Sequence, residues 1–187
     1  MNHVCPMFMA KPLDSRLRRW AQNPRKILQP HIREGMHVLD FGCGPGFLTL
    51  EAARLVGEAG RVIAADIQGG MLDLVAGKVA DTSLASRVVL HRCEADRIGL
   101  DARVDFAVAM YVIHEVSNPR GVIRELAELV RPGGHLLLTE PKFFHVSRKA
   151  FAATVESAES RGLRLVERPR IIMSWTALLR RVELPAT

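Results

Sequence analysis

The sequence predicts an α/β fold built on a doubly wound sheet of seven strands, mostly parallel with a final antiparallel strand. Three observations lead to this prediction. Short apolar runs alternate with amphipathic helical segments, which favours helices on both faces of a parallel sheet. A glycine-rich turn follows the first apolar run. Near the end of the chain, a short turn at 168–170 separates two strand-like runs, and a gap of that length permits an antiparallel pair but no parallel crossover.

Each element follows from a local pattern. Asn23 and Pro24 have the residue types of an N-cap and a first helical position, and the helix that they begin is expected to end near Gly35. Five parallel strands are expected at 37–41, 61–66, 87–92, 104–110 and 135–140. The helical segments lie at 47–56, 71–80, 119–130 and 148–160, and the terminal strand pair falls within 162–180. The chain of 187 residues leaves no segment for a second domain.

The composition is that of a globular protein, with 48% hydrophobic and 25% charged residues. Aromatic residues make up only 5%, which argues against a nucleic-acid platform built on base stacking. The net charge of +6 attracts anions in general, but the basic residues are dispersed along the sequence. The densest basic cluster, at 16–19, is interpreted as the solvated face of an N-terminal helix.

The three cysteines, Cys5, Cys43 and Cys93, show neither zinc-site nor redox spacing, and His3 with Cys5 offers too few ligands for a metal. We therefore expect no metal site and a cytoplasmic, reducing location. Residues 1–20 lack the uninterrupted apolar stretch of a signal sequence, and no run approaches the ~18 apolar residues of a membrane span.

The glycine-rich turn after the first strand predicts a ligand site. Gly42, Gly44 and Gly46 stand at two-residue steps and follow Asp40. Glycine permits a positive φ and close approach of a ligand to the backbone, and the helix that follows presents free N–H groups to an anion. This G-x-G-x-G spacing differs from the dinucleotide fingerprint and from the nucleoside-triphosphate loop.

The stretch "LDFGCGPG" resembles motif I of class I S-adenosylmethionine-dependent methyltransferases. The resemblance extends over about 23–179 and includes, in order, the stretches "AADIQGGML", "CEADRIGL", "VDFAVAMYVIHEVSNP" and "LVRPGGHLLLTEP". The last two are most similar to the branch that contains ubiquinone and menaquinone C-methyltransferases. The resemblance implies a Rossmann-like fold and S-adenosylmethionine as cofactor.

The resemblance also implies roles for single residues. Asp66 matches the acid that holds both ribose hydroxyls, Ile67 the apolar residue on one adenine face, and Glu94 the acid near the adenine amino group. Cys93 stands where the family usually has glycine. The cofactor-binding residues expected on this basis are Asp40, Gly42, Cys43, Gly44, Gly46, Asp66, Ile67, Met71, Glu94, Ala95 and Met110.

The residues that face the transferred methyl group are expected just beyond the strand at 104–110. His114 is the candidate general base, because its unperturbed pKa is near neutrality; the alternative is a histidine that shapes the pocket or caps the next helix. Tyr111 is the second candidate catalytic residue, with a place in the pocket wall or in the core as alternatives. Glu115 either orients His114 or faces solvent. The loop at 143–145, with His145, either borders the cleft or lies on the surface.

The predicted function is methyl transfer to a small-molecule acceptor by in-line displacement. The alternatives are a nucleic-acid or protein methyltransferase, supported only by the basic charge, and a protein that binds S-adenosylmethionine without turnover. Residues 1–22 are expected to form an extension that can cap the active site, 23–181 the methyltransferase domain, and 182–187 a tail. The oligomeric state stays open, with a homodimer as one option.

Overall fold

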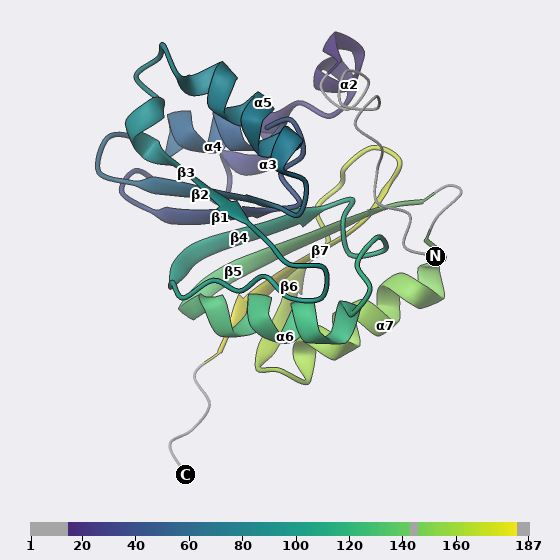
Figure 1. Cartoon of the computed structure of the whole chain (residues 1–187). Helices are drawn as coiled ribbons and strands as arrows, with labels where there is room; N and C mark the ends of the chain where they lie inside the picture. Colours follow the sequence, from purple (N-terminus) through teal and green to yellow (C-terminus); the bar gives the residue numbers. More distant parts are fainter. Residues whose placement is uncertain (1–14, 143–145, 183–187) are drawn as a thin grey trace.

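A seven-stranded sheet forms the centre of the computed structural model, which describes residues 15–142 and 146–182 (Figure 1). Across the sheet the strands run in the order β3 (Val88–Arg92), β2 (Arg61–Asp66), β1 (His37–Phe41), β4 (Val104–Met110), β5 (Val130–Pro141), β7 (Ser174–Arg181) and β6 (Leu163–Glu167). The first five strands of the chain are parallel, and β7 lies antiparallel between β5 and β6. The predicted fold class and the terminal antiparallel pair are confirmed.

Helices cover both faces of the sheet (Figure 1). The helices α3 (Pro24–Leu28), α4 (Thr49–Leu55) and α5 (Gly69–Val79) lie on one face, and α6 (Pro119–Leu129) and α7 (Arg148–Glu159) lie on the other. Residues of β4 alternate between the two cores: Phe106 and Val108 pack in the first, Ala107 and Ala109 in the second. This period of two, with both faces apolar, is the pattern of a strand buried on both sides.

The order of the strands sets the place of the site. β1 pairs with β2 on one side and with β4 on the other, so the crossover connections diverge at this point. Backbone hydrogen bonds join the strand exits, because the N–H groups of Gly42 and Cys43 donate to Ala65 O and Cys93 N–H donates to Asp66 O. In doubly wound folds, ligands bind beyond the carboxyl ends of the strands at such a switch point.

Two predicted boundaries differ from the structure. The Asn23 side chain caps α3 as expected, but the helix ends at Leu28 rather than near Gly35, because Pro30 lacks the N–H that an α-helix needs at that position. β5 begins at Val130, whose partner is Val104, rather than at His135, and the register shifts between these two residues, where Gly133 has φ +82°. The remaining short elements are α2 (Arg16–Ala21) and the 3₁₀ turn η2 (Ala85–Arg87).

Candidate active site

A cavity of about 320 Å³ lies at the carboxyl ends of the central strands. Nearly all of the sequence-predicted site residues line it, although they come from four separate segments of the chain. The predicted residues in its wall are Asp40, Gly42, Cys43, Gly44, Asp66, Ile67, Met71, Glu94, Ala95, Met110, Tyr111 and His114. Gly46 does not line the cavity; its φ of +87° turns the chain toward α5, where an added Cβ would lie 3.2 Å from Val75 Cγ2.

The glycine turn brings bare backbone to the cavity. Gly42 has φ +70° and Gly44 has φ +51°, both in the left-handed region that favours glycine. At Gly42 the space is also occupied, because an added Cβ would lie 2.4 Å from Val112 Cγ2. At Gly44 no heavy atom lies within 4 Å of an added Cβ, so that position opens to the cavity.

These two glycines give a matched pair of variants. Gly44→Ala is expected to lower the free energy of unfolding by about 1–2 kcal/mol, the cost of the left-handed backbone alone. Gly42→Ala should cost a further ~1–3 kcal/mol, because its Cβ would overlap Val112. Urea unfolding of the ligand-free protein measures both changes. Equal losses in the two variants would show that Val112 moves aside without cost.

Two buried carboxyl groups flank the turn. Asp66 is only 7% exposed and accepts hydrogen bonds from Gly44 N–H (2.9 Å) and Gln68 N–H (2.9 Å). Burial raises the pKa of Asp66 above its ordinary value, although both backbone N–H groups act in the opposite direction. Asp40 accepts from Thr49 Oγ1 at 2.6 Å, and burial raises the pKa of Asp40 to about 6. The cavity therefore has two acidic groups within reach of a polar ligand.

Part of the cavity wall is apolar. Ile67 and Met71 contribute apolar side chains, and the buried thiols of Cys43 and Cys93 line the same cavity. Burial raises the pKa of both thiols, so these sulfurs stay protonated and neutral. Glu94 lies at the rim, where its exposed carboxylate pairs with Arg97 at 2.6 Å. A flat, uncharged ring with a polar edge fits such a wall.

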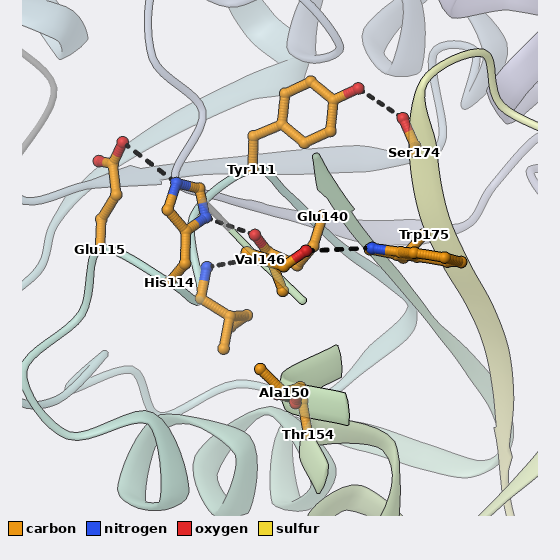
Figure 2. Close-up of polar contacts among 10 residues, drawn as sticks. Tyr111, His114, Glu115, Glu140, Val146, Ala150, Thr154, Ser174 and Trp175 are labelled. Carbon is orange, nitrogen blue, oxygen red and sulfur yellow. Dashed lines mark hydrogen bonds and ion pairs between the residues drawn. The ribbon is translucent and has the colours of Figure 1, made fainter. Parts of the chain in front are cut away.

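His114 is held by a carboxylate that the sequence did not single out. Its Nδ1 bonds Glu140 Oε2, and the other Glu140 oxygen accepts from Ile113 N–H at 2.8 Å (Figure 2). Because an ionised carboxylate only accepts, Nδ1 carries the proton. Glu115, for which orienting His114 and facing solvent were the two alternatives, lies on the other side, with its Oε1 3.8 Å from Nε2. Glu140 therefore fixes the ring, and Glu115 is the weaker neighbour.

The charge around His114 changes its basicity. Burial alone would lower the pKa of His114, but the hydrogen bond and the negative charge of Glu140, with a contribution from Glu115, raise it above the ordinary value of 6.5. The side chain of His114 is 19% exposed and that of Glu140 only 3%. This arrangement suits a group that takes up a proton near neutral pH.

Tyr111 lies in the cavity wall with a strained backbone. Its φ of +62° is unusual for a bulky residue, and its N–H donates to Thr139 O at 2.8 Å. The hydroxyl bonds Ser174 at the start of β7 (Figure 2) and also accepts from Gln22 Nε2. Strained residues of this kind cluster at functional sites, where the surrounding contacts hold them in place.

Sequence reasoning missed part of the N-terminal side of the cavity. Arg18 of α2 lines it, with its guanidinium 4.1 Å from the ring centre of Phe47 and 5.4 Å from that of Tyr111. The interpretation of 16–19 as a solvated face is therefore wrong for Arg18, although the helix itself is confirmed. An Arg that stacks on two aromatic rings gives no periodic signal in sequence.

His3 and Cys5, which offer too few ligands for a metal, and the loop at 143–145 with His145 lie outside the described residues. Within residues 15–142 and 146–182, no group of three or more His, Cys, Asp or Glu side chains is placed to hold a metal ion. None of the helices in this part of the chain is both long and apolar enough to cross a membrane.

The sheet order and this site define a class I S-adenosylmethionine-dependent methyltransferase fold. The chain matches the family model of the methyltransferase domain over residues 32–178, and it belongs to that family. A structure described as a SAM-dependent methyltransferase from Aquifex aeolicus is 26% identical, with a TM-score of 0.83, and the match covers 96% of this chain and 100% of that one.

Curated relatives and a further structure add detail. The ubiquinone/menaquinone biosynthesis C-methyltransferase UbiE of Azotobacter vinelandii is 33% identical over 110 residues, which is 58% of this chain and 44% of the relative. The chain thus spans less than half the length of this relative. The [4+2]-cyclase SpnF has the same fold, with a TM-score of 0.67 and 22% identity over 80% of this chain and 60% of that one.

Proposed function

We propose that this protein transfers the methyl group of S-adenosylmethionine to a small-molecule acceptor. One observation carries the proposal: a single cavity is lined both by the glycine turn with Asp66 and by His114, which Glu140 holds. The fold alone is insufficient, since the cyclase SpnF shares it. The site therefore has to supply both a cofactor end and an acceptor end, and the cavity offers residues for both.

The residues present fit the cofactor. At Gly44, where an added Cβ would meet no heavy atom within 4 Å, the turn leaves room for the methionine part, and Asp40 suits its ammonium group. Asp66 can accept from two ribose hydroxyls, and Ile67 covers one face of the adenine. When bound, S-adenosylmethionine supplies a methyl group on a sulfonium that is already a good leaving group.

The chain itself contributes positioning and a base. Walls that hold an acceptor in line with the methyl group and exclude water are worth roughly 7–11 kcal/mol of the barrier. His114, with its proton fixed on Nδ1 by Glu140, offers Nε2 to take a proton from the acceptor, which adds about 10²–10⁴-fold. We assign Tyr111 to the cavity wall, because its hydroxyl is already bonded to Gln22 and Ser174.

The size of the cavity and the relatives support a small acceptor. About 320 Å³ accommodates a small molecule rather than a folded macromolecule. The matched relative is named a C-methyltransferase of quinone biosynthesis, and methylation at carbon releases a proton that a base such as His114 would take. A cytoplasmic location stays a prediction, supported by the free thiols of Cys43 and Cys93.

We also propose that residues 1–22 cap the acceptor side. The described part of this segment supports the proposal, because Arg18 stacks on Phe47 and Gln22 Nε2 donates to Ile172 O at 2.9 Å as well as to Tyr111. These contacts join α2 to the end of β4 and to the loop before β7. The domain would then comprise 23–181, with 182–187 as a tail.

Transfer of a radiolabelled methyl group tests the proposal. The protein is incubated with labelled S-adenosylmethionine and host-cell extract, and the products are separated into small molecules, protein and nucleic acid. Label in the small-molecule fraction is expected. Label in protein or nucleic acid would instead favour a macromolecular acceptor, and no label with tight cofactor binding would favour a protein that binds without turnover.

Cofactor affinity should depend on pH through Asp40. Because the pKa of Asp40 is about 6, protonation below that pH removes the negative charge assigned to the ammonium group. We expect the affinity for S-adenosylmethionine to fall about tenfold per pH unit below pH 6. Calorimetric titration from pH 7.5 to 5 measures this. Asp40→Asn should bind more weakly at neutral pH and lack this dependence; a flat profile in the wild type would contradict the role.

Protonation of Asp40 does not destabilise the folded state, so the expected loss of affinity at low pH does not come from unfolding through this residue. A raised pKa means that the folded state favours the protonated carboxyl group. The contribution of Asp40 to stability is therefore greatest below the ordinary value of 3.8 and declines as the pH rises through about 6. Affinity and stability thus change in opposite directions with pH at this residue.

A further inference from the structure

An open groove of about 760 Å³ lies next to the active-site cavity, at the same end of the sheet. The start of α7, the end of β5 and the segment that connects β6 to β7 form its wall. Apolar and aromatic side chains make up most of the lining, together with four basic residues. The basic residues are Lys142, Arg148, Arg168 and Arg170.

The positive charge in this groove is not balanced from within. Among the described residues that line it there is no Asp or Glu, and none of the four basic residues forms an ion pair with a described residue. Two of them contact neutral groups: Arg168 donates to Thr176 O at 3.4 Å, and Lys142 Nζ lies 4.9 Å from the Trp175 ring centre. Four like charges in one concave surface attract an anion.

The groove and the cavity are lined by neighbouring residues. Pro141 lines the cavity and the next residue, Lys142, lines the groove. Ser174 lines the groove while its hydroxyl bonds Tyr111 in the cavity wall. Trp175, which also lines the groove, is the register partner of Glu140, and Figure 2 shows both on the same side of the Tyr111–Ser174 contact. The lining of the groove therefore adjoins Tyr111 and Glu140, the second of which holds His114.

We propose that this groove binds an anionic group of the methyl acceptor, a phosphate, pyrophosphate or carboxylate, while the reacting atom lies in the cavity near His114. The inference rests on the proposed function and names the class of its acceptor. Guanidinium groups bind phosphate and carboxylate oxygens through paired, charge-assisted hydrogen bonds, and the groove holds three of them. The apolar lining, with Ile171 and Phe151, suits a hydrocarbon or aromatic body attached to the anion.

A small acceptor fits the groove better than a nucleic acid does. Single-stranded nucleic acids need aromatic faces on which successive bases stack. The one tryptophan in this groove already has Lys142 over its ring, and aromatic residues are only 5% of the chain. The anion would therefore be recognised by charge, at one place, beside a single reacting centre.

Binding of inorganic pyrophosphate tests the site. The full chain is saturated with S-adenosylhomocysteine, so that the cofactor cavity is filled, and pyrophosphate is titrated by calorimetry. Arg168→Gln with Arg170→Gln should weaken binding at least about tenfold, because each removes a charge-assisted contact. Lys142→Gln with Arg148→Gln removes the other two charges and leaves the turn before β7 unaltered. Weaker binding in this variant too would show that the loss does not come from a local change at that turn. Arg124→Gln with Arg164→Gln removes two charges from exposed residues outside the groove and should leave binding unchanged.

Two further measurements distinguish the outcomes. Labelled product from the methyl-transfer assay should be retained on an anion-exchange resin. Absence of pyrophosphate binding, equal loss in the Arg124/Arg164 control, or label only in neutral product overturns the proposal. If an oligonucleotide or phosphatidylglycerol vesicles bind more tightly than pyrophosphate, with the same dependence on Arg168 and Arg170, the proposal of a small acceptor is wrong. Because the titration needs no turnover, failure of the groove and failure of methyl transfer are separable.

Discussion

Asp66→Ala is expected to weaken the binding of S-adenosylmethionine at least about 100-fold. The buried carboxylate holds Gly44 N–H and Gln68 N–H, and we assign two ribose hydroxyls to the same oxygens. Hydrogen bonds to a charged group contribute about 1.5–3 kcal/mol each, and 1.4 kcal/mol corresponds to tenfold in affinity. Two lost contacts to the ribose therefore account for the expected change. Calorimetric titration with S-adenosylhomocysteine measures it.

The fold should survive this substitution. The two backbone N–H groups lose their acceptor, but the variant also removes a carboxyl group whose ionisation burial opposes. Circular dichroism and thermal unfolding check that the folded state persists. Asp73→Ala, which removes an exposed acid from α5, is the matched control and should leave the affinity unchanged. Unchanged affinity in Asp66→Ala would remove Asp66 from the ribose role.

His114→Ala is expected to lower turnover by about 10²–10⁴-fold and to leave cofactor affinity within a few-fold of the wild type. We assign the ring to the acceptor end of the cavity, so its loss should remove a base rather than a cofactor contact. Steady-state kinetics with the acceptor found by radiolabelling measures the loss. His37→Ala, an exposed histidine at the start of β1, should retain full turnover. Full activity in His114→Ala would exclude the base.

The Glu140→Gln variant tests whether Glu140 positions the His114 ring or only supports the fold. A glutamine amide can donate to Nδ1 and so move the ring proton to Nε2, the nitrogen that has to accept one. Because the charge of Glu140 raises the pKa of His114, the variant should also shift the rising limb of the pH–rate profile to lower pH. Glu140→Asp should recover part of the activity. Lower turnover with an unshifted profile would indicate damage to the fold rather than loss of positioning.

Much of the fold was predictable because local patterns determined it. The apolar runs at β1, β2 and β4 have buried neighbours on both faces, so their hydrophobicity alone marked them as strands. The short gap before β7 allowed only an antiparallel partner, as observed. The glycine turn was visible because Gly42 and Gly44 adopt backbone angles that other residues avoid. Their roles toward the cofactor stay predictions.

The partner of His114 was missed because it depends on geometry between segments. Glu140 and His114 are separated by 26 positions and meet only because β4 and β5 are parallel neighbours. One signal was present: Glu140 closes an apolar strand, and a charged residue at the carboxyl end of a central strand faces the ligand edge. Tyr111, at the end of β4, has a positive φ, and sequence does not reveal that conformation in a tyrosine. Arg18 was missed for a similar reason, since its place depends on Phe47 and Tyr111.

A crystal structure of the protein with S-adenosylhomocysteine tests the central claim most directly. The ribose hydroxyls are expected on Asp66, the adenine beside Ile67, and the amino-acid part at the glycine turn near Asp40. The sulfur should face the side of the cavity that carries His114 and Tyr111. A ligand bound elsewhere, or with its sulfur turned away from His114, would contradict the division of this cavity into a cofactor end and an acceptor end.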